Sequence, residues 1–271
     1  MSRKSYLYHH HTWPELGEVA KKKPVVVLPI GSVEDHGHHL PLDTDNFIIW
    51  SICEEAAKRA DGDILLMPLI PYGFETHHMD FTGTIDVKIE HLLHFVLDIT
   101  KSVAHHGFDR IIIADGHGSN MPILELVARR TNLETDALCG AFIWPSLALK
   151  EIREVRESGR GGMAHAGELE TSVYLHIASE KVQFDKAKKD INLPDSEFIW
   201  LDLTDGAPIH LMDHWTRFSK TGVHGDPTLA TPEKGKVIYE AVVNAFVRLV
   251  KEFKDRPRGE RTDYHKESPQ V

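Results

Sequence analysis

The sequence predicts an α/β fold built around a mostly parallel central sheet. An apolar run at residues 24–30 has the length and composition of a strand that is buried on both faces. Similar runs alternate along the chain with helical patterns, as in repeated strand–helix–strand units. Polar segments rich in histidine and glycine follow these runs, at the position where open parallel sheets bind ligands. We therefore expect helices on both faces of the sheet, in a three-layer αβα sandwich.

The expected elements follow from local patterns. Thr12 is a suitable N-cap for a short helix ahead of the first strand. Apolar residues at helical spacing predict a helix from Thr44 or Asp45 to Ala60, where Asp61-Gly62 ends it. Further strands are expected at 64–70, 110–114 and 137–144. Further helices are expected at 88–106, after Asn120 as far as about residue 131, at 173–178 and at 232–253. Residues 179–231 show no clear period.

Length and composition fit one α/β domain over residues 1–255, followed by a charged C-terminal tail at 256–271. The formal net charge of −10 argues against a nucleic-acid or anionic membrane partner. No run approaches the roughly 18 apolar residues of a membrane span, and the N-terminus has no apolar signal core. Two cysteines give no disulfide framework. We therefore expect a cytoplasmic protein.

The segment after the first strand is the densest in potential metal ligands. The twelve positions 34–45 hold seven carboxylate or imidazole side chains: Asp35 and the candidate ligands Glu34, His36, His38, His39, Asp43 and Asp45. Glu34 and His36 flank Asp35, so in an extended segment both leave the same face. Carboxylates and imidazoles without cysteine suit zinc, manganese or iron. A solvated polar loop is the alternative, but the position directly after a buried strand favours a metal site.

Two later segments add polar side chains at strand ends. His77 and His78 lie in a long loop after the second strand. His117 follows the third strand between two glycines, which let the backbone approach a ligand closely. Asp115 and Asn120 are expected to orient His117 or, as the simpler role, to cap the following helix.

Three motifs together resemble the creatininase (creatinine amidohydrolase) family. They are residues 31–37 (GSVEDHG) with Leu40-Pro41 and Thr44-Asp45, residues 116–120 (GHGSN), and residues 165–172 (HAGELETS). The resemblance implies a creatininase-like αβα sandwich that holds two divalent metal ions per chain, zinc with manganese or iron as alternatives. It places Glu34 and His117 on one ion and His36 on the other, and it makes Asp45 the bridge between the two ions.

The residue that supplies the last ligand of the second ion differs between this chain and creatininase itself. There a Glu stands two residues after the metal-binding His, whereas this chain has Ser119. Relatives with the Gly-His-Gly-x-Asn form use the last Glu of the HAGxxET motif, so the resemblance assigns Glu170, with Glu168 as the alternative. Two divalent ions, three carboxylates and one bridging hydroxide form a neutral cluster, which can be buried at modest electrostatic cost.

The implied activity is metal-dependent hydrolysis, in which a metal-bridging hydroxide attacks a carbonyl carbon. His165 is placed near the ligands, where it would carry the proton to the leaving nitrogen or, alternatively, orient Glu170. We expect the opening of a small cyclic amide or the cleavage of a formamide C–N bond. Two alternatives stay open: C–C cleavage in a cyclic diketone such as an oxidised inositol, and a non-catalytic metal-binding subunit.

Three further side chains are candidates for substrate contact. His78 comes from the loop after the second strand, and Tyr72 and Trp144 stand at strand ends, where large aromatics wall apolar pockets or simply fill the core. The resemblance implies a small-molecule substrate and a homo-oligomer, with hexamers known in the family.

Overall fold

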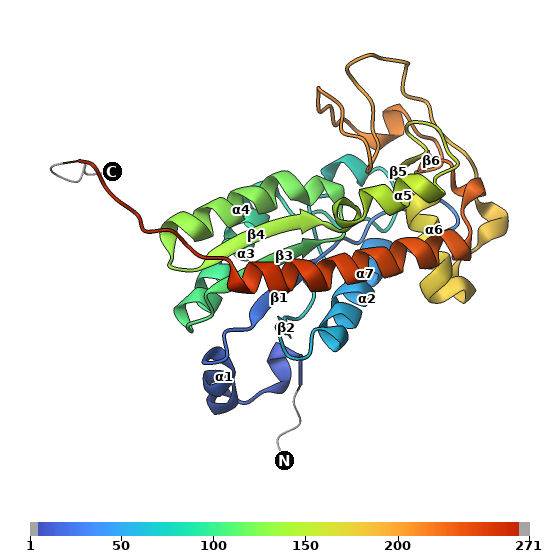
Figure 1. The fold of residues 1–271 in the computed structure, drawn as a ribbon. Helices are drawn as coiled ribbons and strands as arrows, with labels where there is room; N and C mark the ends of the chain where they lie inside the picture. Colours follow the sequence, from blue (N-terminus) through green and yellow to red (C-terminus); the bar gives the residue numbers. More distant parts are fainter. Residues whose placement is uncertain (1–4, 266–271) are drawn as a thin grey trace.

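A four-stranded parallel sheet forms the centre of the computed structural model, which describes residues 5–265 (Figure 1). The strand order is β2-β1-β3-β4. The strands are β1 (Val25–Ile30), β2 (Ile64–Leu66), β3 (Arg110–Asp115) and β4 (Leu138–Ile143). All six residues of β1 are buried, which is why this stretch is apolar without alternation.

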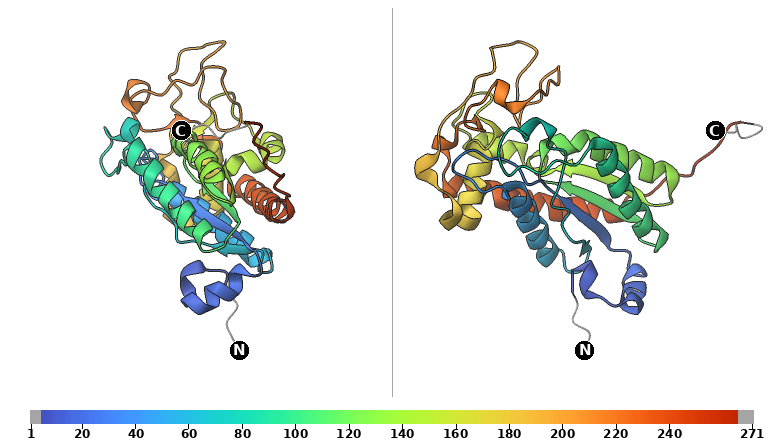
Figure 2. Two further views of the ribbon diagram at one scale, coloured as in Figure 1. Left: turned by 90° about the vertical axis from the view of Figure 1, so that its left-hand side faces the viewer. Right: turned by 180° about the vertical axis from the view of Figure 1, so that it is seen from behind.

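Helices cover both faces of the sheet (Figure 2). Successive strand residues point to opposite faces, so Val25 and Val27 pack in one core and Val26 and Leu28 in the other. The first core includes residues of α2 (Thr44–Arg59), α5 (Leu149–Val155), α6 (Glu168–Ala178) and α7 (Pro232–Asp255). The second includes residues of α3 (Ile89–His105) and α4 (Met121–Glu134). The predicted three-layer αβα sandwich is therefore confirmed.

Three elements differ from the sequence-based expectation. β2 ends at Leu66 rather than at 70, because Pro68 cannot donate to the ladder, although Ile70 still forms an isolated bridge with Ile30. α6 begins at Glu168, five residues earlier than expected, so its first turns carry the motif residues. A small antiparallel pair, β5 (Met163–His165) with β6 (His224–Gly225), was not predicted.

The segments at the two ends of the described chain each contact the sheet, through a parallel bridge between Leu7 and Leu66 of β2 and a hydrogen bond from Arg110 of β3 to the carbonyl of Arg256. The short helix α1 (Trp13–Ala20) has a capping box between Thr12 and Glu15. After α7, residues 256–265 are exposed and run away from the body, although the Arg258 guanidinium donates to the carbonyl of Ala137 at 3.0 Å. The rest of the predicted tail, residues 266–271, lies outside the described residues. Across residues 5–265, no helix has the length and apolar character needed to cross a membrane.

Candidate metal centre

The site lies beyond the carboxyl ends of β1 and β3. These strands are neighbours, yet the chain leaves β1 toward β2 on one side and β3 toward β4 on the other, which makes this a topological switch point. Gly116 lets the loop after β3 approach the start of α2, because a Cβ there would meet the carbonyl oxygen of Asp45 at 2.6 Å. The loops after both strands and the first turn of α2 therefore converge on one buried spot.

One group of side chains surrounds the Nδ1 atom of His117. This atom lies 3.0 Å from Oε1 of Glu34 and 3.1 Å from Oδ2 of Asp45. The hydroxyl of Ser32 donates to the same Asp45 oxygen at 2.7 Å, which fixes the carboxylate. Glu34 is completely buried. Two carboxylates and one imidazole thus present ligand atoms to a common point.

A second group surrounds the Nε2 atom of His36. This atom lies 3.1 Å from Oδ1 of Asp45 and 4.0 Å from Oε2 of Glu170. The same Glu170 oxygen accepts a hydrogen bond from the amide of Ala166 at 2.6 Å. Asp45 therefore directs one carboxylate oxygen to each group, and the five predicted ligands lie together.

Electrostatics and hydrogen bonding both fit divalent cations at these positions. Within residues 5–265, the carboxylate oxygens of Glu34 and Nε2 of His36 have no hydrogen-bond partner despite complete burial. Burial alone would lower the pKa of His36, but the carboxylates of Asp45, Glu34 and Glu170 raise it to about 10. The site therefore attracts positive charge strongly, and its donors are those of zinc, manganese or iron sites.

Two further imidazoles face the centre in orientations fixed by Asp35. Nε2 of His165 lies 2.8 Å from the carbonyl oxygen of Asp35, which can only accept, so Nε2 carries the proton and Nδ1 is free. That Nδ1 lies 3.7 Å from Oε1 of Glu34. His78 lies with Nδ1 3.0 Å from the Asp35 carboxylate, and its ring stacks on Trp215. Burial holds the pKa of His165 well below its ordinary value, so this imidazole is neutral.

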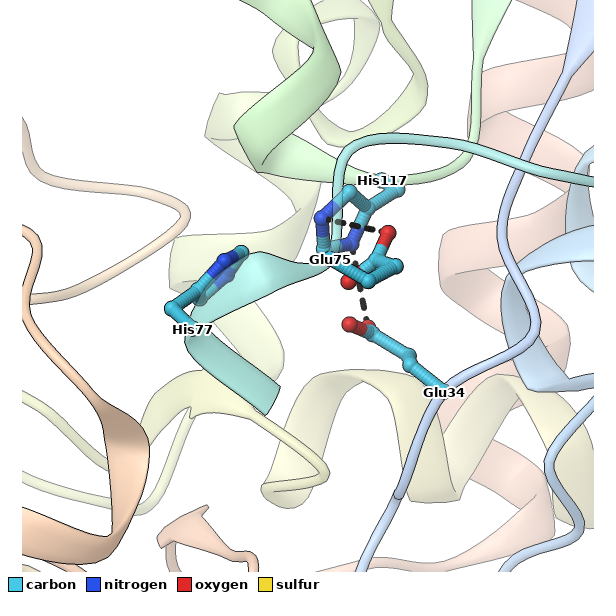
Figure 3. Close-up of side chains that lie close together, drawn as sticks. All are labelled: Glu34, Glu75, His77 and His117. Carbon is cyan, nitrogen blue, oxygen red and sulfur yellow. Dashed lines mark ion pairs between the residues drawn. The ribbon is translucent and has the colours of Figure 1, made fainter. Parts of the chain in front are cut away.

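Glu75 and His77 belong to the same cluster but were not predicted as site residues. Figure 3 shows Glu34 and Glu75 at opposite nitrogens of the His117 ring. Oε1 of Glu75 lies 3.0 Å from Nε2 of His117, and the Glu75 side chain is completely buried. Burial and the neighbouring Glu34 raise the pKa of Glu75 well above its ordinary value. The only sequence signal was an acidic residue within the long polar loop after the second strand.

A cavity of about 360 Å³ opens above the centre. Glu34, His78, His117, His165 and Glu170 form its floor. Its walls come largely from a segment that the sequence left unassigned, and they include Trp200, Leu201, Leu203, Leu211, Met212 and Trp215. His78 thus lines the cavity, as expected of a substrate contact.

Tyr72 and Trp144 do not line this cavity, in contrast to the expectation. Trp144 follows β4 and is 1% exposed within the core that α2, α6 and α7 share, so it fills the interior. Tyr72 is 46% exposed and borders a separate apolar groove formed with α3. The chain turns both rings away from the centre as it leaves the sheet.

Neighbouring acidic and amide side chains have structural roles. Asn120 does not cap α4 through its side chain; it donates to the carbonyl of Gly31 and to Asp115. Glu168, the alternative ligand, instead accepts hydrogen bonds from the backbone of Ser158 and from Lys234. Asp43 is exposed.

The comparisons with known proteins identify the family of this chain. The family model described as "Creatininase: Creatinine amidohydrolase" matches residues 9–250. A "Mycofactocin precursor peptide peptidase" of Mycobacterium ulcerans is 32% identical over 93% of this chain and 97% of its own length. A "3-dehydro-scyllo-inosose hydrolase" of Thermotoga maritima is 26% identical over 90% and 82%. A solved structure, "Creatininase Mn", has a TM-score of 0.75 at 25% identity, covering 92% of this chain and 99% of its own. The chain therefore belongs to the creatininase family and is a metal-dependent hydrolase.

Proposed function

We propose that the protein is a two-metal hydrolase that opens a small cyclic amide or cleaves the C–N bond of a formamide. The observation that carries this proposal is the orientation of Asp45, whose Oδ1 faces His36 and whose Oδ2 faces His117, each at 3.1 Å. Glu34 completes one ligand set and Glu170 the other. A carboxylate shared between two such sets is what a pair of adjacent ions requires.

Two divalent ions would lower the pKa of a water molecule toward neutrality and polarise the substrate carbonyl. The chain's own residues hold the ligands in place and move the proton. The Asp35 carbonyl fixes the His165 ring so that the unprotonated Nδ1 faces the centre. His165 would accept the proton of the attacking water there and deliver it to the leaving nitrogen.

Three other functions compete with this proposal. The Mycobacterium ulcerans relative is named as a peptidase, so hydrolysis of a peptide amide is the second candidate. The Thermotoga maritima relative is named as an inosose hydrolase, so ring opening of an oxidised inositol is a further candidate, but the apolar wall residues Leu203, Leu211 and Met212 offer a polyol ring no side-chain hydrogen-bond partner. A non-catalytic metal-binding subunit would have no need for His165 beside a complete ligand set.

The test is elemental analysis of the purified protein followed by turnover on cyclic ureas, lactams, formamides, short peptides and cyclic diketones. About two ions per chain with C–N hydrolysis of a cyclic amide or formamide would support the proposal. Turnover of peptides alone, or of diketones alone, would move the function to that alternative. A protein that takes up no metal even after reconstitution would contradict the two-metal centre itself.

The same proposal covers the metal, the assembly and the compartment. We expect zinc, with manganese or iron as alternatives, because the ligand set has imidazoles and carboxylates but no thiolate. We expect a homo-oligomer, in the hexameric form that the resemblance implies, acting in the cytoplasm. Sedimentation velocity and metal analysis of protein purified without added metal test the first two expectations.

A further inference from the structure

The walls of the cavity carry no free positive charge. Among the described residues that line it, none is a lysine or an arginine; Glu34 and Glu170 belong to the proposed metal centre, which leaves Asp202 as the acidic side chain of the wall. Asp202 is already bound by the Arg156 guanidinium, with distances of 2.6 and 3.2 Å to its two oxygens. Away from the metal centre itself, a carboxylate or phosphate on a substrate would therefore find no lysine or arginine partner in this wall.

Arg160, which contacts the wall residue Trp200, is also engaged. The guanidinium of Arg160 stacks over the ring of Trp200 at 4.2 Å from its centroid, and its Nε lies 3.3 Å from the Asp205 carboxylate. These contacts hold the outer wall together. Neither arginine is therefore available to pair with an anionic ligand.

Apolar side chains gather at the mouth of the cavity instead. Leu211 is 52% exposed and Met212 is 45% exposed, although both line the cavity. Deeper in, Phe74, Leu203 and Trp215 continue the apolar wall toward the metal ligands. A ligand that covers these side chains would remove apolar surface from water, which favours binding roughly in proportion to the area covered.

We infer that the substrate is an uncharged amide whose nitrogen or ring carries an aromatic or branched aliphatic group. This inference rests on the proposed C–N hydrolysis and names its substrate class. The amide carbonyl lies at the metal ligands, and the apolar group extends past Trp215 toward Leu211 and Met212. The cavity volume of about 360 Å³ accommodates such a molecule, whereas a small polar amide would leave the apolar wall exposed to water.

The experiment compares three formamides on the zinc-loaded enzyme at pH 8, where ordinary imidazoles are neutral. Formanilide carries an uncharged ring, its 4-sulfonate adds an anion that binds zinc weakly, and N-methylformamide lacks the ring. Both kcat/KM and the Kd from calorimetry are measured. Formanilide is expected to have a kcat/KM at least about tenfold higher, and a Kd at least about tenfold lower, than each of the other two compounds.

Equal or better binding of the sulfonate, or of N-methylformamide, would overturn the inference. If none of the three is cleaved but the order of Kd values holds, the ligand class stands and formamide cleavage fails; the lactams and cyclic ureas of the panel above then decide the proposed hydrolysis. Met212→Lys places a cation at the mouth and should improve the sulfonate relative to formanilide by about tenfold, with Met212→Gln as the matched uncharged control. An unchanged ratio in Met212→Lys would show that this wall does not contact the ligand.

Discussion

Replacing Glu75 by alanine should weaken the binding of one metal ion without destabilising the protein. When Nδ1 of His117 binds an ion, the neutral ring carries its proton on Nε2, and Oε1 of Glu75 is 3.0 Å from that atom. An ion on His117 would favour the ionised form of Glu75, and a hydrogen bond to such a charged acceptor contributes about 1.5–3 kcal/mol, which corresponds to about 10- to 100-fold in affinity. The same range is typical of carboxylates that orient metal-binding histidines.

Titration of the metal-free protein with zinc, in competition with a chelator, measures this effect. Glu75→Ala should lower the affinity of one of two sites, whereas Glu75→Gln keeps an acceptor oxygen and should lose less. Ser119→Ala is the matched control, because the Ser119 hydroxyl contacts His77 rather than His117. Wild-type affinity at both sites in Glu75→Ala would refute the argument. Three ions per wild-type chain would show instead that Glu75 is itself a ligand.

Stability provides a second measurement on the same variant. Both Glu75 carboxylate oxygens are buried without a hydrogen-bond partner in the described part of the chain. Removing an unsatisfied buried carboxylate relieves a penalty of about 1–3 kcal/mol. The metal-free Glu75→Ala protein should therefore unfold at the same or a higher urea concentration than the wild type. A large loss of stability would mean that Glu75 has a structural role.

The remaining predictions concern the other ligands and their support. Asp45→Ala should lose both ions in elemental analysis, because one oxygen serves each ligand set. Glu170→Gln should empty one site only, and two ions still bound would place the ligand elsewhere. His165→Ala should keep both ions and lower kcat by about 10²- to 10⁴-fold, and an unchanged rate would rule out the proton shuttle. Glu168→Ala should lower the free energy of unfolding by about 1–3 kcal/mol, measured in urea, because the amides of Glu157 and Ser158 lose their carboxylate acceptor, whereas Lys234 keeps Glu157 as a partner. Burial alone would raise the pKa of Glu168, but Lys234 and backbone donors hold this pKa below its ordinary value. The stabilisation by the ionised carboxylate is therefore present above about pH 4.5 and is lost as the pH falls through the folded pKa. The stabilities of the wild type and of Glu168→Gln should therefore converge in acid.

The sequence predicted the candidate metal ligands where residues with suitable side chains directly follow a buried strand. The run at 24–30 is apolar because β1 is buried on both faces, and the ligands follow it directly. Asp45 could be preferred over Asp43 from the family motif, and the structure has Asp45 buried at the centre and Asp43 exposed. The sheet order then explains why segments 80 residues apart in the sequence, around Glu34 and His117, meet at one point.

The sequence could not reveal partners defined only by the fold. Glu75 has no motif and no periodicity, and its importance follows from its distance to His117 across two loops. Trp144 follows β4 just as His117 follows β3, yet one ring enters the core and the other the site, because the backbone after each strand turns differently. Such choices depend on packing between distant segments, which local patterns do not encode.

The division between predictable and unpredictable residues also has a functional meaning. The ions would be held by loops pinned to the sheet, as when the amide of Gly116 donates to the carbonyl of Ile30 at 2.8 Å. The cavity wall comes instead from residues 200–215, whose conformation is irregular apart from a short turn at Trp215–Arg217. A rigid centre beside a loop-built wall allows the wall to change without disturbing the ligands. Relatives named for a peptide and for an inosose share the family while differing in named substrate, as this arrangement would permit. The substrate of this chain should therefore be sought by varying residues 200–215 rather than the metal ligands.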